Sequence, residues 1–451
     1  MRKKKQEGFL AHGDFVYRHD PIPVFVKAKG VYLEDTDGYR YFDAEAANGT
    51  VSLGFDSSIL EEARKIQKNL PSIPSFCETE IRKKVAGKIG KMMLQITKKK
   101  GRIAFELGGA QGMELAIKIV RSNTKKTQLV VFEGGYHGRS AYTSQLSASH
   151  RYRKIMGDWR IPIARLPYPD FEQTYPGLST DEARAIAIKQ VERLLSTETA
   201  GLAIRSGEQD ISALIIEPIL NAGGIVMPDK KYLETVVKMF RKAGALIVVD
   251  EIFCGFYRTG KMFGFQHYTI SPDIVVMSKA ITNGIAPLSC VWGRDPYMLP
   301  AKFPPGTHSA TYINNPGTLA IADVVLDRYQ KWETKEKDIK KLERSLHDII
   351  QKIVQSSALV KSGYSIGGIG RILLTENIAG NILDIALTIG RKNPIKGVHG
   401  LILASTGMAP NVIALNPPLN INTADVEILR KLLSQTFKVA ETKYSVVSES
   451  S

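Results

Sequence analysis

The chain lacks the features that mark secreted, membrane and fibrous proteins. Only three of its 451 residues are cysteine (Cys77, Cys254 and Cys290), and they form no Cys-x-x-Cys pair. An odd number without such spacing favours a reduced, intracellular chain, so we expect a cytoplasmic protein. No apolar run approaches the roughly 20 residues of a membrane span. A secretion signal requires an apolar stretch after its basic N-terminus, and this sequence has none there. The sequence therefore predicts a soluble protein with no membrane partner.

Acidic residues are also comparatively scarce. The chain has 61 lysines and arginines against 45 aspartates and glutamates, which gives a formal net charge of +16. Short lysine runs at residues 3–5, 98–100 and 125–126 could contact nucleic acid. They are scattered, and no zinc finger, RNP motif or basic–aromatic stripe accompanies them. We therefore expect a solvated surface that attracts anionic ligands, with neither a nucleic-acid partner nor a metal site. A basic nucleic-acid-binding protein without catalysis remains a remote alternative.

The middle of the chain alternates helical and strand-like segments. Hydrophobic residues make up 43 % and charged residues 24 % of the sequence, as in an ordinary globular protein. From about residue 57 to 325, amphipathic stretches such as 57–67 and 111–121 alternate with short β-branched runs. These runs cover residues 128–132, 213–216, 245–249 and 274–277. Continuous apolar strands separated by helices predict an α/β fold with a mainly parallel sheet covered by helices on both faces.

The two ends of the chain have a different pattern. Residues 30–35 and 39–43 flank the turn Thr36-Asp37-Gly38 and predict a β-hairpin. After residue 318 the sequence predicts a long interrupted helix over 319–354. Three strands and a closing helix at about 423–439 follow. The hairpin is too small to stand alone, so we expect it to pack with this α+β tail. The predicted division is an N-terminal segment at 1–56, a large domain at 57–320 and a small domain at 321–451.

Two chemically informative side chains follow buried strands. Asp250 ends the run Val248-Val249-Asp250, where α/β sheets build their sites. Lys279 follows the run 273–277, and a lysine desolvated there can act as an amine nucleophile. Taken singly, Lys279 could be a surface lysine and Asp250 a structural carboxylate. A lysine that forms a Schiff base, paired with a carboxylate facing a pyridinium nitrogen, is what pyridoxal phosphate chemistry requires.

Two loops complete this pattern. The sequence Gly108-Gly109-Ala110-Gln111 opens a predicted helix, whose free N–H groups could hold a phosphate. Tyr136, in Gly135-Tyr136-His137-Gly138, follows a predicted strand and could stack on a flat ring. Each segment also has an ordinary interpretation, as a tight turn and as packing. In this order along the chain, the four weak signals reinforce one another.

With these residues the sequence resembles the class III pyridoxal-phosphate aminotransferases of fold type I. The resemblance covers nearly the whole chain and is most specific from Val249 to Lys279. It implies the large and small domains of that fold, pyridoxal 5′-phosphate as cofactor, and a homodimer or a dimer of dimers. It also implies transamination between an amino donor, of the ω-amino type, and an oxo acid. An amino-acid racemase, epimerase or aminomutase on the same scaffold is the alternative.

The resemblance assigns roles to individual residues. Lys279 would carry the cofactor and move protons, Asp250 would keep the pyridine nitrogen protonated, and Glu217 would lie near the substrate. Ile252 and Tyr136 would pack against the ring, and Thr311 would reach the phosphate from a second subunit. The implied cofactor-binding set is Gly109, Ala110, Tyr136, His137, Asp250, Ile252, Phe253, Lys279 and Thr311.

The sequence departs from the family at several positions. Ala110 replaces a Ser or Thr of the phosphate turn, Gln111, Gly112 and Met113 replace Glu-Ala-Asn, and Phe253 replaces a Gln. Ala414 lies where many members carry the arginine that clamps a substrate carboxylate. Loss of a bidentate arginine removes orientation as well as affinity. We therefore expect Arg139 or Arg258 to supply the clamp if a dicarboxylic oxo acid is used.

Overall fold

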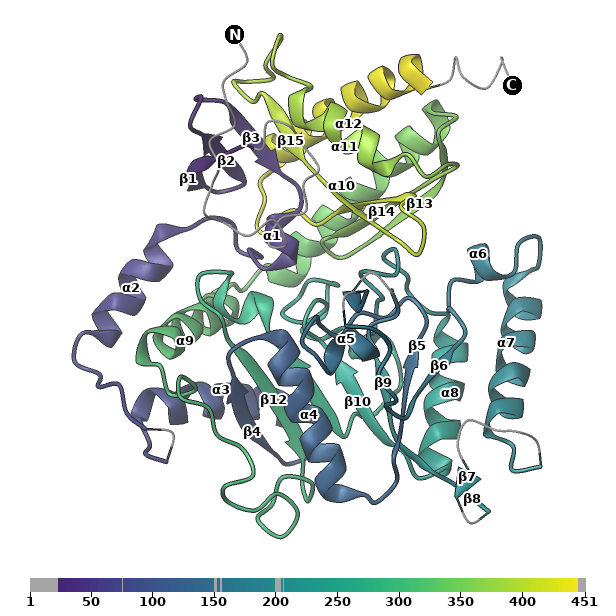
Figure 1. The fold of residues 1–451 in the computed structure, drawn as a ribbon. Helices are drawn as coiled ribbons and strands as arrows, with labels where there is room; N and C mark the ends of the chain where they lie inside the picture. The colour runs from purple at the N-terminus through teal and green to yellow at the C-terminus, as the bar shows by residue number, and fades with distance from the viewer. Residues whose placement is uncertain are drawn as a thin grey trace.

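The computed structural model describes residues 23–444 except 75, 150–151, 155, 199–203 and 206. A large sheet with its helices occupies the lower part of Figure 1, and two smaller sheets with the C-terminal helices lie above it. Both chain ends contribute to the upper part. The interface between the two parts lies above the carboxyl ends of the large sheet's parallel strands.

The large sheet has seven strands in the order β4-β12-β11-β10-β9-β5-β6. Their bounds are β4 Gly101–Glu106, β5 Gln128–Phe132, β6 Ile163–Leu166, β9 Ile211–Ile216, β10 Leu246–Asp250, β11 Ile274–Met277 and β12 Ser289–Arg294. All pair in parallel except β12, which is antiparallel to both β11 and β4. The predicted mainly parallel sheet is therefore confirmed, with strands at or within a few residues of the predicted runs.

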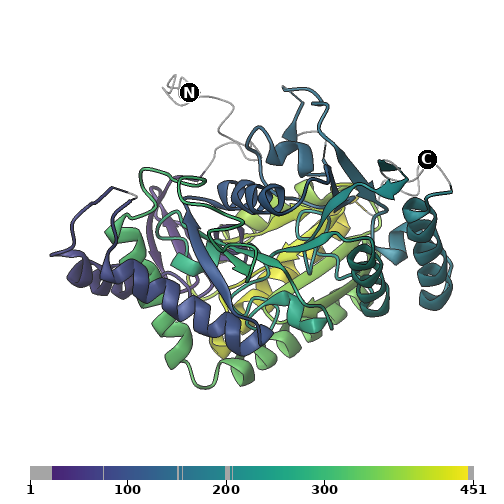
Figure 2. The same cartoon turned by 90° about the horizontal axis from the view of Figure 1, so that it is seen from below.

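Alternate residues of the central strands face opposite ways. Val249 and Val275 belong to one hydrophobic core, whereas Val248 and Val276 belong to another on the opposite face. The first core is covered by α2 Ser57–Gln67, α3 Glu80–Thr97, α7 Thr180–Leu195, α8 Lys230–Lys242 and α9 Pro316–Lys331, and the second by α4 Gly109–Asn123 and α5 Thr143–Leu146. Figure 2 shows α3 and α4 on opposite sides of β4. Short elements lie between the strands and helices of this part. They are α6 Phe171–Thr174, β7 Ile204–Arg205, β8 Glu208–Gln209, and the 3₁₀ turns η3 Gly264–His267 and η4 Lys279–Thr282.

The predicted hairpin packs with the C-terminal part of the chain. Its strands are β1 Phe25–Lys29, β2 Tyr32–Asp35 and β3 Arg40–Asp43, followed by the short turn α1 Ala46–Gly49. Strand β3 pairs in parallel with β15 Gly400–Ile402, which closes a four-stranded sheet. A second sheet has the order β13-β14-β17-β16, with bounds β13 Val360–Ile366, β14 Ile369–Leu374, β16 Ala404–Thr406 and β17 Val412–Leu415. Helices α10 Lys335–Ser356, α11 Ala379–Thr388 and α12 Thr423–Tyr444 pack on these sheets.

The interrupted helix breaks between Lys331 and Lys335, which separates α9 from α10. The apolar residues of α9 belong to the core of the large sheet, whereas those of α10 belong to the core of the smaller sheets. The domain boundaries stay a prediction, and these cores favour a division in the break rather than at residue 320. In the described residues, no helix is both long and apolar enough to span a bilayer.

Candidate active site

The carboxylate of Asp250 lies at the carboxyl end of β10, where the sequence predicts it. Its Oδ1 accepts a hydrogen bond from the backbone N–H of Ile252 at 3.1 Å, and its Oδ2 lies 2.9 Å from Nδ1 of His137. Both side chains are buried. Burial lowers the pKa of His137, but the hydrogen bond and charge of Asp250 more than offset this and raise it overall. The histidine therefore fixes the orientation of Asp250 and balances its charge.

Lys279 follows β11 and begins η4 with a left-handed backbone, at φ +48°. Its Nζ lies 5.0 Å from the centre of the Phe253 ring. Burial lowers the pKa of the Lys279 amine, while the charges of Glu45, Asp250 and Glu217 act in the opposite direction. A lysine held in this way has a larger neutral fraction than an exposed one, which is what a nucleophilic amine needs.

The N-terminus of α4 opens on the same space. Gly108 is its N-cap and provides no side-chain cap, so the first N–H groups of the helix are left for another acceptor. The backbone is tightly packed here: a Cβ on Gly109 would lie 3.0 Å from Cδ1 of Ile252. A Cβ on Gly112 would lie 2.7 Å from Oγ of Ser289. An alanine at position 112 would therefore require the Ser289 side chain to move.

Glu217 follows β9 and is buried. Its carboxylate accepts the backbone N–H of Tyr136 at 2.7 Å and that of Asn221 at 3.4 Å. Burial raises the pKa of Glu217, with the charge of Asp250 acting in the same direction and that of His137 opposing it. Glu217 thus links the loop that carries Tyr136 to the segment after β9.

One cavity of about 490 Å³ brings these groups together. It is lined by nine of the ten residues to which the sequence assigned a site role: Gly109, Ala110, Tyr136, His137, Glu217, Asp250, Ile252, Phe253 and Lys279. The exception is Thr311, which lines a separate hollow with Phe76 and Tyr312. Asn221, Ser140 and Ser278 also line the cavity and were not predicted, because polar loop residues carry no distinctive spacing.

The two arginines proposed as carboxylate clamps lie in different environments. The guanidinium of Arg139 lines the cavity and lies 4.8 Å from the centre of the Tyr152 ring. Arg258 does not line it and is fully buried. Its guanidinium donates to Ser52 Oγ at 2.8 Å and to the carbonyl of Pro417 at 2.7 Å, and burial lowers its pKa to about 10. Arg258 as a clamp is therefore wrong, since its donors hold three chain segments together.

Apolar side chains fill the neighbourhood of Ala414. Ala414 is buried in β17, in a small hydrophobic cluster that includes Phe253, Ile366 and Ile369. Ala414 stands where many family members carry an arginine, and Phe253 stands where they carry a glutamine. Both belong to one apolar cluster. The side chains at these two positions therefore provide no charge with which to bind a second carboxylate.

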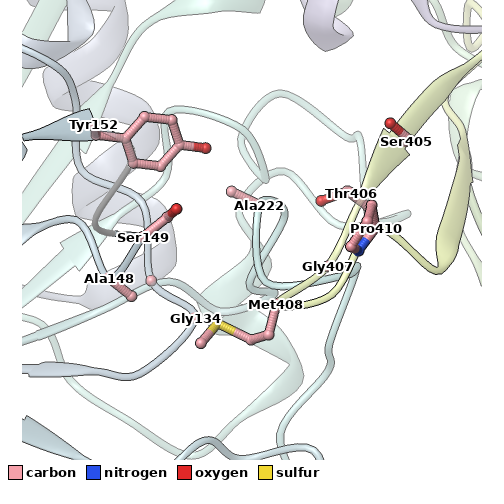
Figure 3. Close-up of a pocket in the computed structure, with 11 residues that line it drawn as sticks. Gly134, Ala148, Ser149, Tyr152, Ala222, Ser405, Thr406, Gly407, Met408 and Pro410 are labelled. Carbon is pink, nitrogen blue, oxygen red and sulfur yellow. The ribbon is translucent and has the colours of Figure 1, made fainter. Parts of the chain in front are cut away.

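A second cavity of about 350 Å³ adjoins the first. Gly135 and Ala222 line it, next in sequence to Tyr136 and Asn221, which line the larger one. In Figure 3, Tyr152 and Ser149 face the segment Thr406–Pro410 across this space, and Met408 extends toward Gly134. The described side chains that line it are uncharged.

A buried lysine, a strand-end carboxylate and an uncapped helix N-terminus in one cavity define a pyridoxal-phosphate enzyme of fold type I. The aminotransferase class-III family model matches residues 16–437, and the chain belongs to this family. It is a pyridoxal-phosphate-dependent aminotransferase that acts on an amino donor and an oxo acid. The predicted family, fold class, cofactor and reaction are confirmed.

Relatives of several specificities resemble the chain at similar levels. It is 24 % identical to an acetylornithine aminotransferase of Streptococcus mutans, over 92 % of this chain and 96 % of the relative. It is 29 % identical to a 2-aminoadipate transaminase of Pseudomonas putida, over 89 % and 92 %. The solved structure of a Bacillus anthracis aminotransferase matches with a TM-score of 0.79 at 25 % identity, over 93 % and 94 %.

Proposed function

We propose that the cavity around Lys279 is the active site and that it transfers a terminal amino group to an oxo acid. The observation that carries this is the convergence of Lys279, Asp250 and the N-terminus of α4 on one cavity. When bound, pyridoxal phosphate supplies an aldehyde that takes up amines and a ring that accepts electron density. The residues fit this group: an amine for the aldehyde, a carboxylate for the pyridinium and free N–H groups for the phosphate.

The residues around Lys279 would hold the cofactor and orient it. The backbone N–H groups of Gly109 and Ala110 would hold the phosphate, favoured by the positive end of the α4 dipole. Tyr136 and Ile252 would pack against the cofactor ring, and the Phe253 ring lies beside the Lys279 amine. His137 holds the Asp250 carboxylate in position through its Nδ1. Lys279 Nζ would take the proton from the carbon that bears the amino group and deliver it again within the same half-reaction, and it would make the reverse transfer with the oxo acid in the second half.

Arg139 binds the substrate carboxylate. It is the arginine among the described residues that line the cavity, and the face of Tyr152 supports its guanidinium. A single clamp suits a donor with one carboxylate and a terminal amine. The adjoining uncharged cavity takes the remote end of a longer substrate. Ala414 and Phe253 disfavour dicarboxylates, and for this reason a racemase or epimerase, which needs no second oxo acid, remains the second candidate.

The active unit is a homodimer, alone or paired into a dimer of dimers. Thr311 is exposed, and so are its neighbours Tyr312 and Phe76, whose exposed fractions are 64 % and 87 %. A second subunit covering this surface would bring Thr311 to the phosphate of the other site. The three free thiols favour a cytoplasmic location, which fractionation of the cells would test.

Borohydride reduction followed by peptide mapping tests the site. We expect label on Lys279 in the wild type and, in Lys279→Ala, a cofactor that binds but is not retained after denaturation. Label on another lysine would overturn the proposal. A donor panel then tests specificity: Arg139→Ala should raise the KM for carboxylated substrates about tenfold to a hundredfold without affecting simple amines. Arg160→Ala, which removes an exposed arginine that does not line the cavity, is the matched control.

A single amino-acid enantiomer offered without any oxo acid separates the two candidate reactions. An aminotransferase gives one equivalent of oxo product per site and then stops. Continued conversion to the other enantiomer without oxo product would favour the racemase instead.

A further inference from the structure

Asn221 lines the active-site cavity with a side chain that the fold does not use. It follows β9, in the same segment as Glu217, and lines the cavity around Lys279. Asn221 is half-buried, and its side-chain amide forms no hydrogen bond with the part of the chain that the structure describes. An asparagine amide has two N–H donors and one oxygen acceptor. These groups are therefore available to a molecule bound in the cavity.

The backbone of Asn221 is fixed on both sides. Its N–H donates to Glu217 Oε2 at 3.4 Å, and its carbonyl accepts the hydroxyl of Thr406 at 2.7 Å. The carbonyl also accepts the N–H of Gly224 at 3.1 Å. Thr406 belongs to β16, so contacts from both the large sheet's segment and the smaller sheets hold this residue. A side chain on a backbone held in this way loses less conformational freedom when it binds a ligand.

The strand order places Asn221 on one side of Asp250. Strands β11, β10 and β9 are neighbours in that order, and Lys279, Asp250 and the segment that holds Asn221 follow them. Helix α4 packs mainly against β11 and β12. A Cβ on Gly112, in the first turn of α4, would lie 3.1 Å from Cγ1 of Val276 in β11. The N-terminus of α4 and Asn221 therefore lie on opposite sides of Asp250.

The constitution of pyridoxal phosphate relates these groups to one another. Its ring nitrogen and its aldehyde lie at opposite ends of the ring, and its phosphate arm and phenolic oxygen lie on opposite sides of the line between them. Asp250 suits the nitrogen, Lys279 the aldehyde, and the N-terminus of α4 the phosphate. With these three groups in place, the phenolic oxygen would face the side of β9, where Asn221 lies.

The neighbours of Asn221 on this side are apolar or are hydrogen-bond acceptors. Phe253 packs in one apolar cluster with Ile219 and Ile225, which lie on either side of Asn221 in the sequence. The carboxylate of Glu217 accepts two backbone N–H groups and has no donor of its own. The amide of Asn221 therefore provides an uncharged N–H donor on this side of the cavity.

We propose that the side-chain amide of Asn221 donates a hydrogen bond to the phenolic oxygen of the cofactor. The inference rests on the proposed function, because it requires pyridoxal phosphate in this cavity. A hydrogen bond from an N–H group favours the ionised form of that oxygen, and hydrogen bonds to ionised atoms are among the stronger ones. The contact with Thr406 then also has a role, since a hydroxyl from the smaller sheets keeps a cofactor ligand in position.

The test pairs two variants of Asn221 with two cofactors. Asn221→Ala removes the donor, whereas Asn221→Asp keeps the size and presents a carboxylate to the phenolic oxygen. The full-length protein is loaded with pyridoxal phosphate or with its deoxy analogue, which lacks the phenolic oxygen. Absorbance after dilution then gives the dissociation constant of each.

For pyridoxal phosphate we expect the dissociation constant to rise about tenfold in Asn221→Ala and further in Asn221→Asp. For the deoxy analogue it should be the same in Asn221→Ala as in the wild type, because no hydrogen bond is lost. Asn393→Ala and Asn393→Asp change an exposed asparagine that does not line the cavity. They are the matched controls and should change the binding of neither cofactor.

Each result decides the inference. Equal weakening of both cofactors in Asn221→Ala overturns it, because the side chain would then act through packing and not through the phenolic oxygen. Unchanged binding of pyridoxal phosphate in Asn221→Ala also overturns it. Both results leave the proposed function intact. A wild-type protein in which borohydride labels no Lys279 overturns the proposed function itself and, with it, this inference.

Discussion

His137 Nδ1 lies 2.9 Å from Asp250 Oδ2, and the two side chains are only 2 % and 3 % exposed. A buried carboxylate is costly unless it is paired and hydrogen-bonded. The histidine meets this need, and the backbone N–H of Ile252 provides a second hydrogen bond. The pair links two strands, because Asp250 ends β10 and His137 lies on the loop after β5. Resemblance suggested His137 as a cofactor ligand, and the structure places it in the cavity with its Nδ1 bonded to Asp250.

Replacing His137 tests this support. His137→Phe removes the hydrogen bond to Asp250 while keeping a ring of similar size, so the Asp250 carboxylate should be less well oriented. We expect cofactor to dissociate about tenfold to a hundredfold more readily, the equivalent of roughly 1.5–3 kcal/mol. Loss of the visible absorbance on dilution measures this. His347→Phe, an exposed change on α10, should leave retention unchanged; equal retention in the two variants would contradict the role.

Arg258 should matter for stability more than for substrate affinity. It is buried and donates to Ser52, to the carbonyl of Pro417 and, at 3.3 Å, to that of Gly368. Arg258→Met leaves these buried acceptors without their donor, so we expect a loss of about 3 kcal/mol or more in urea unfolding. Arg258→Lys should recover part of it. A rise in the KM for carboxylated substrates at unchanged stability would restore Arg258 as a clamp.

Glu251 should make stability depend on pH. It is fully buried, and its carboxylate accepts the N–H groups of Gly264 at 2.8 Å and Phe265 at 2.7 Å. Burial raises its pKa to about 8 from an ordinary 4.5. Between these values the folded state holds one more proton than the unfolded chain, so this residue stabilises the fold at low pH and its contribution declines as the pH rises.

The expected decline is roughly 1.4 kcal/mol for each pH unit across that interval. Urea unfolding of the wild type and of Glu251→Gln, measured at pH 5, 6, 7 and 8, isolates it. The unfolding free energy of the wild type minus that of Glu251→Gln should fall steadily as the pH rises. A difference that stays constant with pH would show that Glu251 remains ionised in the fold.

Ala414 offers a route to a changed substrate. Ala414→Arg alone would bury a charge in an apolar cluster, so we expect a lower unfolding temperature and little gain in activity. Combining it with Phe253→Ala makes room for the guanidinium. The KM for a dicarboxylic oxo acid should then fall about tenfold relative to Phe253→Ala, while that for a monocarboxylic one stays the same. An equal change in KM for both acids would show that the second carboxylate of the substrate does not lie near position 414.

Local sequence determined the elements that carry the chemistry. The apolar runs 128–132 and 274–277 form β5 and β11 as predicted, because a buried parallel strand needs a continuous apolar segment. The positions of Asp250 and Lys279 follow directly, since residues that end parallel strands meet at one edge of the sheet. The glycines before α4 likewise predicted an uncapped helix N-terminus.

Tertiary structure decided what these elements meet. Nothing near Arg258 in the sequence shows that its donors reach Ser52 and Pro417, more than 150 residues away, so it could be taken for a substrate ligand. The left-handed backbone of Ala46–Asn48 was equally hidden, because alanine ordinarily favours a helix and only contacts with distant segments impose this turn. Periodicity and strand ends report local burial. The charge around Lys279 instead depends on residues from three separate segments, which only the folded chain brings together.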